Sequence, residues 1–124
     1  YIMLHKPAGY LSATTDLQYP TVIELIDHPL RDELHLAGRL DRTSTGLLLL
    51  TNDGRWSKRV TEPTEKIPKI YRVTTRDIIV ADTTSIFAAG IYFAYESIGP
   101  FVLDSSLPSG KFRHLSPTEV ACFI

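Results

Sequence analysis

The stretch GRLDRTSTGLLLLTNDG, residues 38–54, sets the organisation of the whole chain. A charged segment bracketed by Gly38 and Gly46 leads directly into Leu47–Leu50, the most apolar run in the sequence. Because residues that break regular structure bound this run, we expect a buried central strand rather than a helix. Such a strand would hold the preceding segment in a fixed orientation, and functional residues are often placed on loops held in this way.

Asp41 is the candidate functional residue of this segment, and Arg39 and Arg42 flank it. One interpretation is a surface ion-pair cluster, which contributes less than about 1 kcal/mol to stability. The other is a carboxylate kept ionised by adjacent positive charge, as a nucleophile needs to be. The spacing of the residues alone leaves both interpretations open.

The rest of the chain predicts many short strands and few helices. Thr21 and Glu24 have the spacing of a capping box, which predicts a short helix through Ile26. Asn52 or Asp53 is expected to cap a second helix. We expect strands or extended segments over 1–4, 10–15, 47–50, 70–74, 91–95, 98–103 and 112–115, and helices over 55–61 and 81–90 and from residue 116. This pattern indicates an α+β fold with a mainly antiparallel mixed sheet.

Length and composition fit one domain over residues 1–124. No apolar run approaches the roughly 18 residues of a membrane span, and we expect no membrane partner. A single cysteine, Cys122, excludes an internal disulfide and suits a reducing compartment, so we expect a cytoplasmic protein. The chain begins within an expected strand and shows no signal peptide, which predicts that an upstream part is absent from it.

Charge is unevenly distributed along the chain. Residues 55–76 carry a net charge of +5, whereas the remaining residues carry −6. Within the expected helix, Arg55, Lys58 and Arg59 fall on one face. A cluster of this kind favours a polyanionic partner, although a solvated basic face without a partner explains it equally well.

The sequence gives no sign of a cofactor. It contains neither the dinucleotide fingerprint nor the phosphate-binding loop of nucleotide hydrolases. No group of His, Cys and carboxylate residues has metal-ligand spacing, and His35 is expected to be structural. Asp53 is the sole nearby candidate for a second catalytic carboxylate, but its place in a turn signal accounts for it. A nucleotide cofactor and a metal site are therefore unsupported by the sequence.

Three short motifs occur in the order found in one family. Gly38-Arg39-Leu40-Asp41-x-x-(Ser/Thr)-x-Gly46-Leu47-Leu48 resembles the signature of the pseudouridine synthases that modify ribosomal RNA. Lys6-Pro7-x-Gly9 is similar to the upstream motif of that family, and Lys69-x-Tyr71-x-Val73 is similar to its downstream motif. The segments between them resemble the small-subunit type. The resemblance covers residues 1 to about 96 and resumes weakly from 98 to 115.

This resemblance implies a catalytic domain with a central RNA-binding cleft that isomerises uridine in small-subunit (16S) ribosomal RNA without cofactor or metal. Asp41 would attack a flipped uridine, and Tyr71 would pack on its base and assist the final proton removal. Ribosomal RNA within a pre-ribosomal particle would be the partner of a monomeric enzyme. The implied RNA-binding residues are Arg39, Arg42, Lys6, Arg55, Lys58, Arg59, Lys69 and Arg72.

Two departures from the family pattern keep alternatives open. The small N-terminal RNA-binding domain of such enzymes is not in this sequence, and some forty residues of the family pattern are lacking near the 96–97 junction. The lacking segment supplies a basic partner for the catalytic aspartate in the family. The alternatives are therefore an enzyme for large-subunit (23S) RNA, or a non-catalytic protein that binds RNA or assists ribosome assembly.

Overall fold

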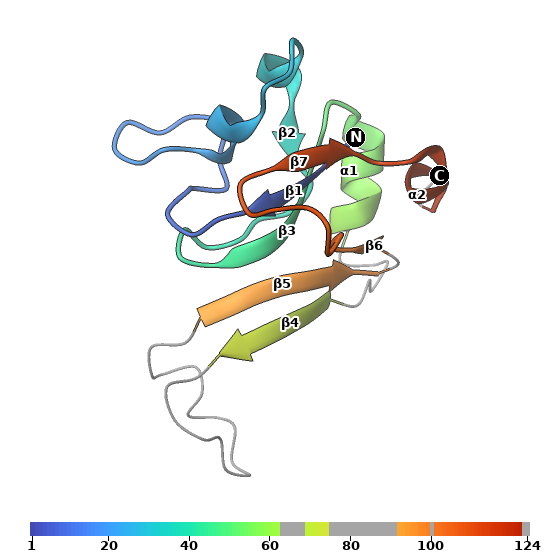
Figure 1. Ribbon diagram of the computed structural model, residues 1–124. Helices are drawn as coiled ribbons and strands as arrows, with labels where there is room; N and C mark the ends of the chain where they lie inside the picture. The colour runs from blue at the N-terminus through green and yellow to red at the C-terminus, as the bar shows by residue number, and fades with distance from the viewer. Residues whose placement is uncertain (63–68, 75–91, 100, 123–124) are drawn as a thin grey trace.

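A mixed sheet forms the centre of the computed structural model, which describes residues 1–62, 69–74, 92–99 and 101–122 (Figure 1). For residues 73–74 and 92–95 only the backbone is described. The strands are β1 (Ile2–Lys6), β2 (His35–Leu36), β3 (Thr45–Thr51), β4 (Lys69–Thr74), β5 (Tyr92–Ile98), β6 (Phe101–Val102) and β7 (Phe112–His114). The helices are η1 (Val22–Leu25) and η2 (Arg31–Glu33), both of the 3-10 type, and α1 (Gly54–Thr61) and α2 (Pro117–Ala121).

The strands lie in the order β4-β5-β3-β1-β7, with β2 paired to β3 and β6 paired to β5. Neighbouring strands are antiparallel, except that β3 and β5 are parallel. This arrangement confirms the predicted α+β class with a mainly antiparallel mixed sheet.

The central strand β3 is buried on both faces. Leu47 and Leu49 join a core cluster on the α1 side, together with Trp56 and Val60 of that helix. Leu48 and Leu50 point to the other face, into a second cluster with residues of β1 and η1. Because both faces are covered, the strand is continuously apolar instead of alternating. The prediction of a buried central strand over 47–50 is confirmed.

Helix α1 begins where the sequence predicts it. The carboxylate of Asp53 accepts hydrogen bonds from the backbone N–H groups of Arg55 and Trp56, both at 3.1 Å, which satisfies donors that a helix start leaves unpaired. The indole Nε1 of Trp56 donates to the carbonyl oxygen of Val120 at 3.1 Å, which attaches α1 to α2.

Several other expectations are confirmed, and some are wrong. The strands over 1–4 and 70–74 and the terminal helix form, and the capping box opens η1, where Thr21 N–H donates to Glu24 at 2.7 Å. The extended segment expected over 10–15 is instead a loop with a single bridge at Leu11. The strand expected over 98–103 is divided by a turn at Gly99, whose φ of 54° favours glycine. The helix expected over 81–90 lies outside the described residues.

The 96–97 junction lies inside β5, and the pairing of β5 with β4 shifts register there, between Ile70 and Tyr71. The carbonyl oxygen of Glu96 accepts a hydrogen bond from Leu103 N–H at 2.8 Å. The lacking segment at this junction stays a prediction. Among the described residues, no helix has the length and apolar character needed to cross a bilayer.

Candidate active site

The segment with Asp41, residues 38–46, connects β2 to β3 and includes the first two residues of β3; we call it the Asp41 loop. Its two terminal glycines have φ angles of 115° and 116°, values that side chains rarely allow. Within it, Ser44 N–H donates to the carbonyl oxygen of Asp41 at 3.0 Å and closes a turn. The side chain of Asp41 is exposed to solvent, whereas Ser44, three residues later, is buried. The loop therefore presents its carboxylate outward from a fixed base.

Lys6 holds the backbone of the Asp41 loop in place. Its side chain is fully buried, and Nζ donates to the carbonyl oxygens of Pro7 at 3.0 Å, Arg42 at 3.2 Å and Ser44 at 2.7 Å. Burial lowers the pKa of Lys6 to about 8, while the negative charge of Asp41 raises it and Arg42 lowers it further. The prediction that Lys6 binds RNA is corrected here, because a buried ammonium with three backbone acceptors cannot reach a phosphate.

The turn after β1 also supports the loop. Ser12 Oγ donates to the carbonyl oxygen of Leu40 at 2.8 Å and accepts from Leu40 N–H at 3.0 Å, and Gly9 N–H donates to the carbonyl oxygen of Arg42 at 2.7 Å. The sequence analysis missed Ser12, and its sole signal was a serine three residues beyond the Lys-Pro-x-Gly motif. Residues 6–12 therefore hold the backbone on both sides of Asp41.

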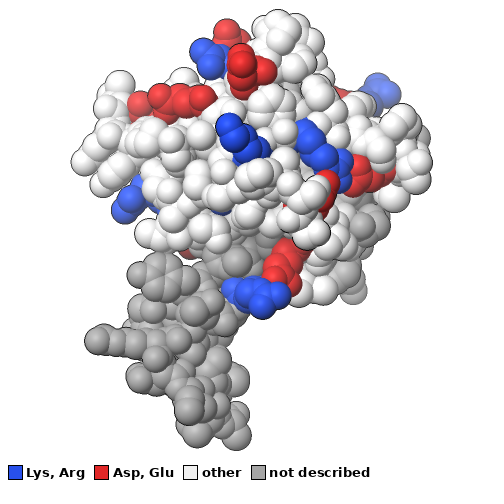
Figure 2. Space-filling model, in the orientation of Figure 1, with Lys and Arg blue, Asp and Glu red and all other residues white. Residues whose placement is uncertain are grey.

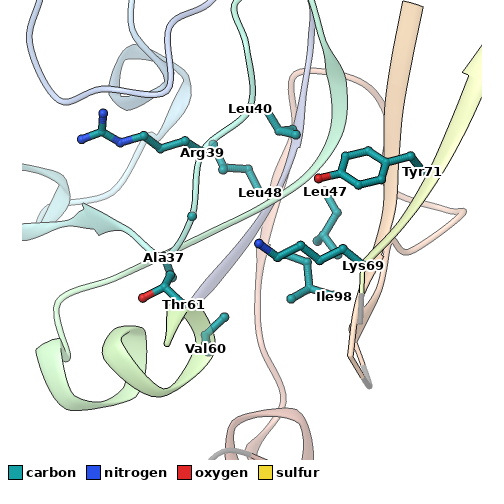
Figure 3. A pocket seen from close by; sticks show the side chains of 11 residues that line it. Ala37, Arg39, Leu40, Leu47, Leu48, Val60, Thr61, Lys69, Tyr71 and Ile98 are labelled. Atoms are coloured by element: carbon teal, nitrogen blue, oxygen red, sulfur yellow. The ribbon is translucent and has the colours of Figure 1, made fainter. Parts of the chain in front are cut away.

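A small cavity of about 50 Å3 lies beside the Asp41 loop (Figure 3). Lys69 and Tyr71 enter it from β4, and Leu40 lies on the opposite side. The other lining residues come from the β2–β3 connection and from β3, α1 and β5: Ala37, Gly38, Arg39, Leu47, Leu48, Val60, Thr61 and Ile98. The cavity is thus lined by residues of both the Asp41 motif and the Lys69-x-Tyr71 motif. Asp41 is not among the lining residues, but the two residues before it, Arg39 and Leu40, are.

The side chains of Tyr71 and Arg39, which both line the cavity, point in different directions. Tyr71 is half-exposed at 47% and directs its ring over the cavity. The side chain of Arg39 extends away from Tyr71 into solvent (Figure 3). An amphipathic ring above an apolar floor can receive a planar group, whereas an extended guanidinium can contact an anion outside the cavity.

The other predicted basic residues are exposed on separate surfaces. Arg55, Lys58 and Arg59 share the solvent face of α1, and Trp56 and Val60 are buried on its other face. Arg72 forms an ion pair with Glu96 at 2.5 Å and is not among the cavity-lining residues. On the face shown in Figure 2, the basic side chains of the described residues are scattered, and some of them lie beside acidic ones. The basic residues therefore do not merge into one continuous patch on that face.

The fold and the site define the class of protein. A crystal structure described as that of a pseudouridylate synthase superposes with a TM-score of 0.87 at 29% sequence identity, and the match covers 99% of this chain and 73% of the other. The sequence pattern of the family described as RNA pseudouridylate synthase matches residues 1–114. This chain therefore belongs to the RNA pseudouridylate synthase family.

Three relatives carry the same name, ribosomal small subunit pseudouridine synthase A. The protein from Pseudomonas aeruginosa is 51% identical over 125 residues, covering 93% of this chain and 54% of the relative. The protein from Escherichia coli is 42% identical over 111 residues, covering 88% and 48%. The protein from Pasteurella multocida is 45% identical over 169 residues, covering 99% and 73%. The chain thus spans about half the length of the first two relatives.

Proposed function

We propose that this chain isomerises a uridine of small-subunit ribosomal RNA to pseudouridine, with Asp41 as the nucleophile. Membership of the RNA pseudouridylate synthase family supports the reaction class, and the names of the three relatives support the small-subunit RNA. The observation that carries the proposal is an exposed Asp41 on a loop that Lys6 and Ser12 hold beside a cavity lined by Tyr71.

The reaction requires no change of oxidation state. A carboxylate oxygen of Asp41 attacks the flipped nucleotide, either at the anomeric carbon of the ribose or at the uracil ring. The N-glycosidic bond breaks, the base rotates, and carbon C5 of the base forms a bond to the anomeric carbon. If Asp41 is bonded to the anomeric carbon, the new C5 bond displaces its carboxylate oxygen; if it is bonded to the uracil ring, that oxygen leaves the ring afterwards. C5 loses a proton and N1 gains one, so the proton count is unchanged and the enzyme returns to its initial state. The same atoms enter and leave, so the step needs no cofactor.

In this scheme the flipped base packs on Tyr71 beside the cavity. A uracil stacked in an RNA helix cannot be reached, so the nucleotide must be extruded, at a cost of a few kcal/mol. Packing on Tyr71 would offset part of that cost, because base–aromatic stacking contributes about 1–3 kcal/mol per base. Lys69 enters the same cavity and could contact a phosphate or a uracil carbonyl. Arg39 and Arg42 would contact the RNA around the vacated position.

A second function is favoured by one specific comparison. The match to the Pasteurella multocida relative extends over 169 positions, 45 more than the 124 residues of this chain. The relative therefore contains positions that have no counterpart here. The alternative is a chain that binds ribosomal RNA on the same surface without catalysing the isomerisation.

Replacement of Asp41 by Asn tests the proposal. The variant keeps the shape of the side chain and removes its charge, so we expect pseudouridine formation to fall to background while RNA binding persists. Asp32, exposed in η2, offers a matched control, and Asp32→Asn is expected to retain full turnover. Pseudouridine would be mapped by chemical labelling and primer extension on small- and large-subunit transcripts.

These measurements distinguish the proposed isomerase from the non-catalytic RNA-binding function and from an enzyme for large-subunit RNA. Turnover retained in Asp41→Asn would reject Asp41 as the nucleophile. Transcript binding by the parent chain without any pseudouridine would favour the non-catalytic function. Modification confined to the large-subunit transcript would replace the proposed substrate while keeping the chemistry.

A further inference from the structure

The segment before η1 forms a braced loop, residues 13–20, which we call the Tyr19 loop. Its two ends meet at Leu11, which donates to the carbonyl oxygen of Pro20 at 2.9 Å and accepts from Val22 N–H at 3.0 Å. Inside the loop, the carboxylate of Asp16 accepts from the backbone N–H groups of Gln18 at 2.8 Å and Tyr19 at 2.7 Å. These bonds define the conformation of the loop, whose blue trace after β1 extends away from the sheet in Figure 1.

The Tyr19 loop is joined to the Asp41 loop. Ser12, directly before it, makes both of its hydrogen bonds to Leu40, the residue preceding Asp41. At its other end, the guanidinium carbon of Arg42 lies 4.7 Å from the centre of the Tyr19 ring. A guanidinium over an aromatic face is an attractive arrangement. The two loops therefore form one unit, with Asp41 between the two points of attachment.

The outer surface of this unit combines aromatic, apolar and cationic groups. Tyr19 is 41% exposed, and Leu17, two residues before it, is fully exposed. A single exposed leucine is ordinary in a soluble protein. A tyrosine stacked on an arginine is different, because aromatic rings and guanidinium planes are the groups on which proteins stack unpaired RNA bases. Tyr19 also lines a hollow of about 420 Å3 formed by residues 14–21 and Glu24.

We propose that the Tyr19 loop is a second RNA-binding element, in which the Tyr19–Arg42 pair stacks an unpaired base adjacent to the flipped nucleotide. The inference rests on the proposed function, which supplies the RNA and the need to unstack it. Extrusion of one base leaves its neighbours without a stacking partner, and the platform replaces that partner. Arg42 contributes positive charge toward the RNA backbone, and Leu17 covers the exposed edge of the stacked base, as apolar side chains do at opened base steps.

Binding of a defined RNA tests the platform directly. The probe is a single-stranded RNA 12-mer of mixed sequence that carries one 2-aminopurine, whose fluorescence is quenched when it stacks on an aromatic ring. The variants are Tyr19→Ala, which removes the ring, and Tyr19→Phe, which keeps it. Val102→Ala is the control, since Val102 is an apolar residue of β6 that is 65% exposed. Circular dichroism and thermal melting establish that each variant is folded.

We expect Tyr19→Ala to weaken binding of the 12-mer by roughly 5- to 150-fold, the range for loss of one base–aromatic stack, and to abolish the quenching. Tyr19→Phe and Val102→Ala should bind and quench like the parent. Equal binding by Tyr19→Ala and the parent, or no binding by the parent, would overturn the platform. Because the 12-mer assay needs no turnover, Tyr19-dependent binding without pseudouridine formation would contradict the isomerase and leave the platform standing. Unchanged binding by Tyr19→Ala, together with normal turnover by the parent, would overturn the platform and leave the isomerase standing.

Discussion

The Nζ atom of Lys6 lies 2.7 Å from the carbonyl oxygen of Ser44, across the base of the Asp41 loop. The two residues belong to different motifs, and their contact passes beneath the exposed carboxylate. A lysine that looks from the sequence like a phosphate ligand therefore serves as an internal brace. The position of Asp41 depends on that brace, since the loop has exposed side chains over 41–43 and little packing of its own.

Replacement of Lys6 by Met is expected to destabilise the protein and loosen the Asp41 loop. Methionine keeps the length of the side chain but leaves buried carbonyl oxygens without a donor, which costs about 1–3 kcal/mol. Urea denaturation would measure the loss in the free energy of unfolding. Lys111→Met, at an exposed lysine, should change it by less than about 0.5 kcal/mol. Equal effects of the two replacements would contradict the bracing role.

The difference in free energy of unfolding between the parent and Lys6→Met should change with pH in the alkaline range. Burial lowers the pKa of Lys6 from 10.5 in the unfolded chain to about 8 in the folded one. Between these values the unfolded chain holds a proton that the folded chain has released, so this group makes the free energy of unfolding rise with pH. Denaturation of both proteins from pH 7.5 to 10.5 isolates the effect, because other titrating groups cancel. A constant difference across this range would refute it.

The attachment of α2 should weaken in acid. Arg113 donates from Nη1 and Nη2 to the two carboxylate oxygens of Glu119 at 2.9 Å and 3.1 Å, and these bonds lower the pKa of Glu119 to about 2. The group therefore stabilises the fold above pH 4.5 and loses this contribution as the pH falls toward 2. Glu119→Gln should cost about 1 kcal/mol or less at pH 7, since the pair is partly exposed.

The pH profile provides the check on Glu119. The difference in free energy of unfolding between the parent and Glu119→Gln should shrink as the pH is lowered from 4.5 to 2. A difference that stays constant or grows over this interval would show that the ion pair is not its source. Glu24 is unsuitable as a control because it caps η1, whereas the exposed Glu33 is suitable.

Asp53 caps helix α1, and its replacement tests how much the cap contributes to stability. Asp53→Ala removes an acceptor from two backbone N–H groups at the helix start and should lower the free energy of unfolding. It also removes the acceptor of the Tyr1 hydroxyl hydrogen bond. Asp53→Asn, which keeps an oxygen acceptor, should recover most of the loss. If Asn and Ala destabilise equally, the capping contribution is absent.

What the sequence could predict depended on whether the signal was local. The apolar run 47–50 and the Asp53 cap are local patterns, and both give the observed elements. The buried position of Lys6 was not predictable in this way, because it follows from pairing of Lys6 with Gly46 across β1 and β3. Likewise, Ser12 reaches Leu40 through a contact 28 residues apart in the chain. The motifs predict the candidate site, whereas the contacts that hold its loop come from long-range pairing that short patterns do not contain.

Tyr71 offers a test that separates stacking from proton transfer. Its ring overlooks the cavity while its neighbour Ile70, 58% exposed, is not among the cavity-lining residues, so Ile70→Ala is a matched control. Under the proposed mechanism, Tyr71→Ala should weaken RNA binding and abolish turnover, because the base loses its stacking surface. Tyr71→Phe should retain binding and lose single-turnover rate by roughly 10- to 1,000-fold, within and just below the usual range for removal of a positioned proton-transfer group. Single-turnover kinetics at saturating RNA would distinguish these effects. A Tyr71→Phe variant with the full parental rate would assign Tyr71 to stacking alone, since the phenol oxygen is the only atom that the substitution removes.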